Sequence, residues 1–284
     1  MWCYRADSIK IYLDNGAFYF LGRGGVTPRH EYEEFVREAK PDWYPIPQEF
    51  IPIPSMSWDH QCLCLNRTMD INRLFGHDGF VPVIHVSRLL TKYIEAILNH
   101  EQLAAKPTIA LGGIVPNLLR APKAIPYQRV LESLWETRAA FVSKQLHVFG
   151  MGGTATLHLA ALMSFNSLDS SGWRNRAARG IVQLPGKGDR VLADLGNWRG
   201  RQPSKDELAL LEQCSCPACR RHGLDELKAP GITDFNSRAT HNLWVLLEEA
   251  EWITRQLRRG TYEHEFRQRL DNTVFLPLIQ QVLS

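Results

Sequence analysis

Three cysteines lie within six residues of one another, at Cys214, Cys216 and Cys219. This spacing is too tight for three disulfide-forming residues, but it suits three corners of a zinc tetrahedron. The fourth ligand should be a nearby histidine, and the candidates are His222 and His241. We favour His241, because an imidazole on a helix packed against the cysteines can reach the ion, whereas His222 follows so closely that it would strain the turn. Four protein ligands leave no open coordination position, so we expect a structural zinc ion.

The alternative for this cluster is a redox site or a group of free thiols. A second pair, Cys62 and Cys64, alternates with leucine, and we expect these two thiols to be core residues. The first residues do not resemble a signal peptide, and no run of about 18 apolar residues exists. We therefore expect a cytoplasmic protein without a membrane segment. Because the cytoplasm is reducing, clustered cysteines there are expected to bind metal.

Two aspartates, Asp14 and Asp169, stand where an apolar run gives way to small or polar residues. At the carboxyl ends of parallel strands, such side chains face the edge where these sheets perform chemistry. Two carboxylates brought together could divide the work of a retaining glycosyl transfer. One attacks the anomeric carbon, and the other protonates the leaving group and later deprotonates the entering one. The alternative for each aspartate is a loop or helix cap.

The segment that follows Asp169 is basic, although the net charge of the whole chain is only +3. Its local net charge of +5 and its interleaved tryptophans, Trp173 and Trp198, could bind a phosphate backbone and stack bases. The alternative is a solvated basic loop. The cations of this segment are Arg174, Arg176, Arg179, Lys187, Arg190, Arg199 and Arg201.

The elements that would position these residues follow from the apolar pattern. Short apolar runs alternate with longer helical patterns, which favours a parallel sheet with helical crossovers. Residues 181–205 are rich in Gly, Pro, Arg and Trp, and we expect them to be irregular. We expect strands at 9–13, 43–46, 80–86, 108–111, 146–149 and 165–168, and helices at 30–40, 88–103, 127–144, 155–163, 206–213, 238–259 and 263–283.

The size of the chain, 284 residues with 44% apolar and 22% charged, is ample for a sizeable core and excludes a disordered protein. A closed (β/α) barrel needs eight strands, and the expected strands number six. An open doubly wound sheet also fits this count.

The motifs in their order resemble those of the tRNA-guanine transglycosylases. The zinc motif with its His-Asn-Leu partner is specific, whereas the glycine motifs gain weight from their shared order. The matching stretches are Leu13-Asp14-Asn15-Gly16-Ala17-Phe18, Leu111-Gly112-Gly113-Ile114, Phe149-Gly150-Met151-Gly152-Gly153-Thr154, Leu168-Asp169 with Arg179-Gly180, and the three cysteines with His241-Asn242-Leu243.

This resemblance implies a TIM-type barrel with a zinc-binding subdomain and exchange of guanine for a 7-deazaguanine. Asp169 would be the nucleophile and Asp14 the general acid/base, while the backbone at Gly112 and Gly113 would help to hold the purine. We expect residues 1–200 to form the barrel, complete or lacking its first two strands. Residues 201–284 would form the zinc-binding subdomain and terminal helices, with zinc on Cys214, Cys216, Cys219 and His241.

The departures from the family pattern indicate a particular branch. Gln48 stands where the tRNA enzymes have an aspartate that reads guanine, and its amide can both donate and accept. His85 stands where the tRNA enzymes have a glutamine that contacts the base. Their C-terminal RNA-binding module has no counterpart in this sequence. This pattern is similar to the DpdA-type relatives, which insert 7-deazaguanines into DNA.

The sequence therefore predicts an enzyme that replaces guanine in DNA by a 7-deazaguanine, 7-cyano-7-deazaguanine in the first instance, through a covalent aspartyl-glycosyl intermediate. Arg174, Arg176 and Arg179 would bind the nucleic acid. The partners would be DNA and the free 7-deazaguanine base, with a second copy of the chain or accessory DNA-modification proteins. The alternatives are the same chemistry on tRNA, and a non-catalytic nucleic-acid-binding subunit of the same fold.

Overall fold

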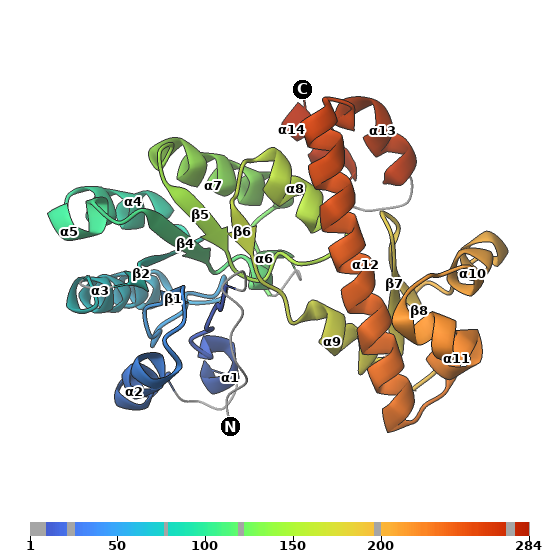
Figure 1. Ribbon diagram of the computed structural model, residues 1–284. Helices are drawn as coiled ribbons and strands as arrows, with labels where there is room; N and C mark the ends of the chain where they lie inside the picture. The colour runs from blue at the N-terminus through green and yellow to red at the C-terminus, as the bar shows by residue number, and fades with distance from the viewer. Residues whose placement is uncertain are drawn as a thin grey trace. The chain divides into compact units, whose positions relative to one another are not determined.

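The computed structural model of the chain describes residues 10–21, 26–76, 79–118, 122–195, 200–270 and 276–283. These residues form two compact units, within Met1–Phe149 and within Gly150–Ser284, which we call the N-terminal and C-terminal units. Short strands alternate with helices in the N-terminal unit, where neighbouring strands are parallel, whereas the C-terminal unit is mainly helical (Figure 1). The predicted mixed α/β class is confirmed at this level.

The N-terminal unit is built from strands whose neighbours run parallel, β1 with β2, β3 with β4, and β4 with β5. Parallel neighbours cannot be joined by a tight hairpin, so helices connect the strands of each pair. Its elements are α1 (Ala17–Leu21), α2 (Arg29–Ala39), β1 (Tyr44–Pro45), α3 (Trp58–Leu74), β2 (Phe80–Val81), β3 (Val83–His85), α4 (Leu90–Leu98), α5 (Glu101–Ala104), β4 (Thr108–Gly112), α6 (Val115–Leu118), α7 (Tyr127–Ala140) and β5 (Gln145–Val148).

Two of the expected strands differ from the structure. Of the strand at 9–13, the described residues keep one parallel bridge, between Tyr12 and Trp43, and Ile9 lies outside them. The strand at 80–86 is divided at Pro82 into β2 and β3, which pair with different neighbours. Proline has no N–H to donate to a ladder, so a break at this position has a direct cause.

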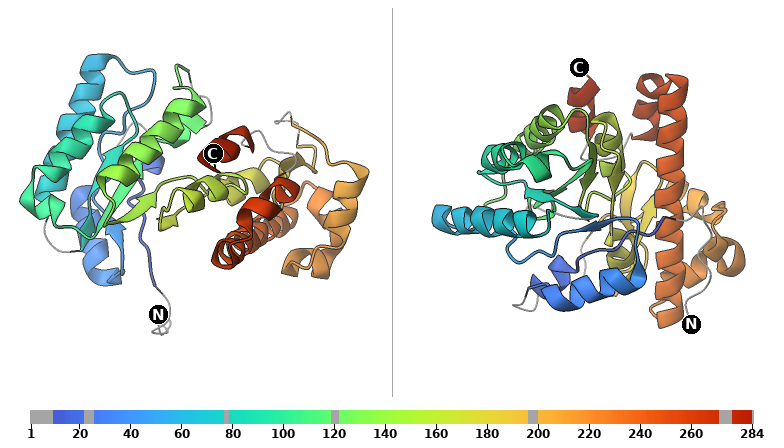
Figure 2. Two further views of the ribbon diagram at one scale, coloured as in Figure 1. Left: turned by 90° about the horizontal axis from the view of Figure 1, so that it is seen from above. Right: turned by 60° about the vertical axis from the view of Figure 1, so that its left-hand side comes forward.

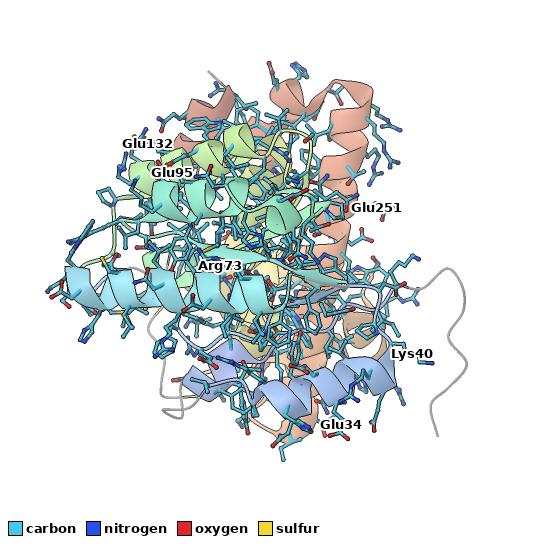
Figure 3. All side chains as sticks on the ribbon, turned by 90° about the vertical axis from the view of Figure 1, so that its left-hand side faces the viewer. Glu34, Lys40, Arg73, Glu95, Glu132 and Glu251 are labelled. Carbon is cyan, nitrogen blue, oxygen red and sulfur yellow. The ribbon has the colours of Figure 1, made fainter. Side chains whose placement is uncertain are left out.

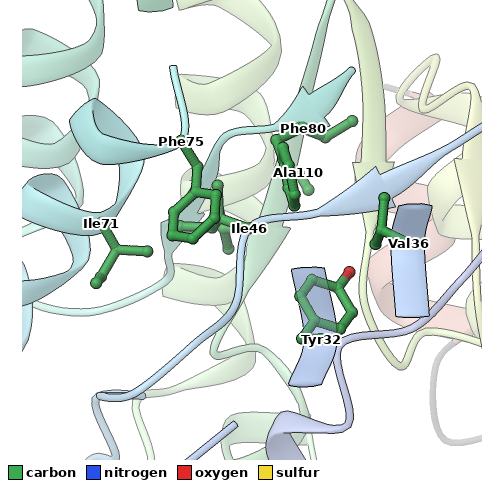
Figure 4. Packing of buried hydrophobic residues seen from close by; sticks show 9 residues of the cluster. Tyr32, Val36, Ile46, Ile71, Phe75, Phe80 and Ala110 are labelled. Carbon is green, nitrogen blue, oxygen red and sulfur yellow. The ribbon is translucent and has the colours of Figure 1, made fainter. Parts of the chain in front are cut away.

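The core of this unit lies where α2 and α3 meet the strands. Phe75, which caps α3, and Phe80 of β2 are both buried, with ring centroids 4.8 Å apart. Figure 4 shows them with Ile46, Tyr32 and neighbouring apolar side chains. Each such side chain contributes about 1.5–3 kcal/mol when fully buried, so this cluster anchors the strands to their helices.

Charged side chains cover the outer faces of the helices of the same unit. Figure 3 labels Glu34 on α2, Arg73 on α3, Glu95 on α4 and Glu132 on α7. The last three each form an ion pair with a residue three positions away on the same helix. Pairs of this kind contribute about 0–1 kcal/mol, so they mark solvent-facing surfaces and add little to stability.

The C-terminal unit is organised along one long helix, α12, which packs against α9, α11 and β7 (Figures 1 and 2). Its elements are α8 (Thr156–Leu162), β6 (Ser167–Leu168), α9 (Gly172–Ala177), β7 (Ile181–Leu184), β8 (Gly188–Val191), α10 (Lys205–Glu212), α11 (Pro217–Lys228), α12 (Ile232–Arg259), α13 (Tyr262–Arg269) and α14 (Leu276–Leu283).

The expectation that residues 181–205 are irregular is wrong for their first half. β7 and β8 form an antiparallel hairpin in which Ile181 lies opposite Val191. Gly186 and Gly188 have φ values of 64° and 79°, and the Lys187 N–H donates to the Leu184 carbonyl (3.1 Å). Glycine adopts these left-handed conformations without strain, so the glycines counted as loop signals are the turn of a hairpin.

The helices also differ from the expected ranges. α12 begins at Ile232, before the expected residue 238, and the expected helix at 263–283 corresponds to α13 and α14, with 271–275 outside the described residues. α3 and α11 were not expected, and α3 carries Cys64, which is buried, and Cys62, which is half-buried. Among the described helices, none has both the length and the apolar character needed to cross a membrane.

A buried ion pair attaches the hairpin to α10. Arg190 of β8 donates from Nη2 to Glu207 Oε1 (2.6 Å) and from Nε to Oε2 (2.9 Å), and both side chains are about 5% exposed or less. The Glu207 carboxylate also accepts the Ser204 N–H, while Ser204 Oγ accepts the Glu207 N–H, which completes a capping box. These contacts, the Arg190 hydrogen bond first, lower the pKa of Glu207 to about 2.

Glu207→Gln should lower the free energy of unfolding by about 2–4 kcal/mol at pH 7, because it leaves the Arg190 charge buried without its partner. The carboxylate pKa is lower in the folded state than in the unfolded chain, so its stabilisation is fully present above about pH 4.5. It is lost as the pH falls toward 2. Urea denaturation of both proteins between pH 3 and 7 measures this difference.

Glu212→Gln on the exposed face of the same helix is the matched control and should change stability by less than about 0.5 kcal/mol. A difference between Glu207→Gln and wild type that does not shrink at acid pH would contradict the assignment.

Candidate functional site

The structure brings together the side chains of Cys214, Cys216, Cys219 and His241, whose potential ligand atoms all lie within 4.8 Å of one another. Cys216 and Cys219 come from the start of α11, Cys214 precedes it, and His241 lies on α12. Three of the four residues are buried. This group could hold a metal ion.

The distances between donors agree with a tetrahedral site. Nδ1 of His241 is 3.5, 3.7 and 3.4 Å from the sulfurs of Cys214, Cys216 and Cys219. A tetrahedron with zinc–sulfur bonds of about 2.3 Å and zinc–nitrogen bonds of about 2.0–2.1 Å has sulfur–nitrogen edges of about 3.6 Å. Soft thiolates with one imidazole are also the donor set that zinc prefers.

The second nitrogen of His241 fixes the orientation of the ring. Nε2 lies 3.0 Å from the carbonyl oxygen of Gln183 on β7, to which it donates as an N–H. With the proton on Nε2, the lone pair of Nδ1 faces the three sulfurs. A second hydrogen bond of this kind accompanies most metal-ligating histidines, and it sets both tautomer and ring angle.

The start of α11 arranges two of the cysteines. Cys216 is the N-cap residue, its sulfur accepts the Cys219 N–H (3.2 Å), and Pro217 occupies the first helical turn, where a missing N–H costs nothing. Hydrogen bonds from Cys214 and Cys219 lower the pKa of the Cys216 thiol. His222 lies further along the helix and contacts Glu226 instead (2.6 Å).

His241 is subject to two opposing electrostatic effects. Burial lowers its pKa, whereas hydrogen bonds with Cys214 and Cys216 and their charges raise it, with a net value of about 9. A proton and a metal cation therefore compete for the same nitrogen, and the thiolates attract either one.

Asp169 follows β6 and is held by the glycine-rich loop at residues 150–153. Its Oδ1 accepts the N–H of Gly150 (2.7 Å), and the next residue, Ser170, donates from Oγ to the Gly152 carbonyl (2.7 Å). A Cβ on Gly152 would lie 2.0 Å from the Cβ of Ser170, so only glycine permits this approach. The half-buried carboxylate thus has a defined orientation.

The three arginines expected to contact nucleic acid differ in exposure, since Arg174 and Arg179 are exposed and Arg176 is half-buried. The two exposed arginines lie on or near α9. Arg176 forms a double contact from its Nε to both carboxylate oxygens of Asp189, at 2.7 and 2.8 Å, so this guanidinium has a partner within the protein. Trp173 is half-buried on α9, and Trp198 lies outside the described residues.

Asp14 belongs to the N-terminal unit and is exposed in the loop that follows residues 11–13. Its neighbour Asn15 fixes that loop, because its Nδ2 donates to the Ile46 carbonyl (2.9 Å) and its Oδ1 accepts the Ala17 N–H (3.0 Å). Asp169 belongs to the C-terminal unit, so the two aspartates are carried by different units.

Gln48, His85, Gly112 and Gly113 do come together in the N-terminal unit. Gln48 Nε2 lies 3.4 Å from His85 Nε2, and His85 is the register partner of Gly112 in the β3–β4 pair. A Cβ on Gly112 would lie 2.8 Å from His85 Nδ1, a buried atom without a hydrogen-bond partner among the described residues. Burial lowers the pKa of His85 to about 3, so this imidazole is neutral at pH 7.

Asn242, part of the His241-Asn242-Leu243 motif, and Gln183 support the metal group, roles that were not predicted from the sequence. Asn242 is fully buried, and its Oδ1 accepts the Gln183 N–H (2.7 Å) while its Nδ2 donates to the Ile181 carbonyl (3.0 Å). It thereby fixes the strand whose carbonyl orients His241. The adjacency of a polar residue to His241 was the available signal, but its partner lies about 60 positions away in sequence.

His241→Ala should abolish metal binding, because three thiolates remain and the ring that closes the tetrahedron is gone. Metal analysis of the purified full chain should give about one ion per wild-type chain and less than about a tenth of that in the variant. The melting temperature should fall with the metal content. His222→Ala is the matched control and should retain the ion; equal losses in the two variants would contradict the ligand set.

No family model matches the chain. Known proteins that are similar to it match about half of its residues. The chain is 32% identical over 152 residues to the tRNA-guanine(15) transglycosylase of Pyrococcus abyssi, which covers 53% of this chain and 23% of the relative. The corresponding values are 30% over 159 residues for the enzyme of that name from Methanopyrus kandleri (55% and 30%) and 25% over 155 residues for that of Archaeoglobus fulgidus (53% and 28%).

The matched part of this chain therefore spans less than a third of the length of these relatives. The similarities support the resemblance to guanine transglycosylases, and the relatives' names refer to tRNA. The DpdA-type branch stays a prediction.

Proposed function

We propose that the protein is a guanine transglycosylase, a pentosyltransferase that exchanges a guanine base in a nucleic acid. The similarity to relatives named tRNA-guanine(15) transglycosylase carries this proposal. The orientation of the Asp169 carboxylate by the Gly150 N–H supports it, because a nucleophilic carboxylate must be held in line with the carbon it attacks.

In the proposed reaction, a carboxylate oxygen of Asp169 forms a bond to C1′ of the nucleotide while the bond from C1′ to the guanine nitrogen breaks. The Asp14 carboxyl gives its proton to the departing base. The incoming base then loses a proton to Asp14, and its nitrogen displaces the aspartate from C1′. Two successive inversions give net retention, and no external energy source is required.

For base recognition we propose the group of Gln48, His85, Gly112 and Gly113. Gln48 offers both a donor and an acceptor, and the neutral His85 offers one of each. The glycines let the His85 imidazole and the backbone of Val86 pack closely against the end of β4, since a Cβ at Gly112 would meet the imidazole and one at Gly113 would meet the Val86 carbonyl. The departures at Gln48 and His85 concern the contacts to the base and leave the assigned roles of the two aspartates unchanged.

We propose that the nucleic acid is tRNA in the first instance, because the names of the relatives favour this alternative over the DNA prediction. DNA with a 7-deazaguanine as the incoming base is the second candidate, supported by Gln48 and His85 at positions where the tRNA enzymes carry other residues. Arg174 and Arg179 are the cations we assign to phosphate contacts. Arg176, paired with Asp189, would position this segment.

We further infer that the ion held by the cysteines and His241 is structural zinc, since its four protein ligands would leave no position for substrate. We also propose a TIM-type barrel over residues 1–200, for which the parallel strands between residues 44 and 148 are the support. Residues 201–284 would be the zinc-binding subdomain, since they contain all four candidate ligands. Assembly with a second copy or accessory proteins stays a prediction.

Asp169→Asn should abolish base exchange, by a factor of about 1,000 or more, because the amide is not a nucleophile. Incorporation of labelled guanine into nucleic acid measures the reaction, and metal content and melting temperature should remain those of wild type. The exposed Asp225→Asn is the matched control and should be fully active. An active Asp169→Asn protein, or a wild type that never forms a denaturant-stable covalent adduct, would refute the mechanism.

Labelled guanine supplied with either tRNA or duplex DNA should enter tRNA. Both substrates are assayed at equal nucleotide concentration and at the same salt, because phosphate contacts make affinity salt-dependent. Label in DNA alone would favour the second candidate. Tight binding of either substrate with no incorporation and no adduct would identify a non-catalytic binding subunit.

A further inference from the structure

A hollow in the N-terminal unit has no role in the function proposed above. It lies beside the segment that follows β3, and its lining includes Gln61, Arg88, Asn117 and Lys123 together with Pro52 and Pro54. The open space of the hollow, mouth included, is about 290 Å³, and its enclosed part is the size of one small group. Its deep part therefore accepts one small group, while its mouth accepts the body of a larger ligand.

Gln61 supplies an unsatisfied acceptor at this hollow. The residue is 2% exposed, and its Nε2 donates to the Met56 carbonyl at 3.4 Å, which orients the amide. Its Oε1 is buried and has no hydrogen-bond partner among the described residues. An unsatisfied buried carbonyl costs about 1–3 kcal/mol, and a ligand that donates an N–H or O–H would remove this cost.

Arg88 and Lys123 add two positive charges to the same lining. Both are exposed, and within the described part of the chain no ion pair engages either of them. Lys123 has a φ of 61°, a left-handed conformation that is uncommon for a residue with a side chain. Two cations at one opening, neither with an ion pair to a described residue, attract an anion, and phosphate fits both guanidinium and ammonium donors.

Two residues that line the hollow contact the backbone of the group assigned to base recognition. Asn117 lines it and donates from Nδ2 to the Gly113 carbonyl (3.0 Å). Val86, another lining residue, follows His85 directly and donates its N–H to the Gly112 carbonyl (2.9 Å). The hollow therefore lies next to the group proposed to bind the exchanged base, at the distance of a neighbouring side chain.

We propose that this hollow binds a nucleotide that flanks the exchanged base. The phosphate contacts Arg88 and Lys123, and an N–H of the base or a hydroxyl of the sugar donates to Gln61 Oε1. The apolar surfaces of Pro52 and Pro54 contact the sugar or base. The flanking position rests on the proposed function, whereas the nucleotide chemistry rests on the lining alone.

The test is an NMR titration of the isotope-labelled full chain with cytidine 5′-monophosphate, its 2′-deoxy form, ribose 5-phosphate and inorganic phosphate. The nucleotides should shift signals of the lining residues and bind at least about tenfold more tightly than phosphate, a difference of about 1.4 kcal/mol. The deoxy form and ribose 5-phosphate distinguish a base donor from a sugar hydroxyl.

Gln61→Leu should weaken nucleotide binding about tenfold and leave phosphate binding unchanged, while stability is maintained or raised because a buried unsatisfied group is removed. Arg88→Gln and Lys123→Gln should each weaken both ligands by about threefold to tenfold. Arg37→Gln, an exposed arginine on α2 outside the lining, is the matched control and should change nothing.

Nucleotides that bind no more tightly than phosphate, or a Gln61→Leu protein with wild-type affinity, would overturn the proposal. Its failure is separable from that of the proposed function. If base exchange is absent but affinity still depends on Gln61, the hollow is a nucleotide site in a protein of another activity. If exchange occurs and Gln61→Leu leaves nucleotide affinity and KM unchanged, only the hollow's assignment fails.

Discussion

The two ring nitrogens of His241 join parts of the C-terminal unit that are distant in sequence. Nδ1 faces three sulfurs at the start of α11, and Nε2 donates to the Gln183 carbonyl of β7. A ring turned over would direct an N–H at the thiolates and leave a buried carbonyl without a donor. The Gln183 carbonyl of β7 therefore orients the ring toward the sulfurs, and two hydrogen bonds to Asn242 hold this part of β7 against α12.

From this strand, contacts continue to the loop that holds Asp169. The hairpin turn donates its Gly186 N–H to Glu249 Oε2 (3.0 Å), and Glu249 Oε1 lies 2.8 Å from His158 on α8. Residues 150–153, one of which binds Asp169, directly precede this helix region, and Gly153 donates to Thr156 at its start (2.9 Å). Glu249 thus joins the hairpin turn to α8, the helix that follows the loop holding Asp169.

Sequence patterns predicted the elements whose periodicity is local. The helix expected at 30–40 corresponds to α2, which buries one apolar stripe. The strand expected at 108–111 corresponds to β4, a short apolar run in which every residue is buried. The hairpin at 181–191 was missed because its glycines are equally typical of loops, and only its packing against α12 distinguishes the two. For the candidate site, the cysteines and His241 could be identified as metal ligands from their residue types. The Gln183 carbonyl that orients His241 could not, because a backbone carbonyl is present at every residue.

In the N-terminal unit, the buried side chains proposed to bind ligands are neutral, whereas the exposed ones are charged. Gln48 and His85 are buried and neutral, since desolvation holds the pKa of the imidazole near 3. A neutral pair suits a neutral purine, because a buried charge without a counter-ion would cost far more than its hydrogen bonds return. The exposed cations Arg88 and Lys123 lie at an opening where water screens them and where a phosphate, which must keep part of its hydration, can reach them. The buried pair is thus suited to hydrogen bonds with a base, and the exposed cations are suited to contacts with a phosphate.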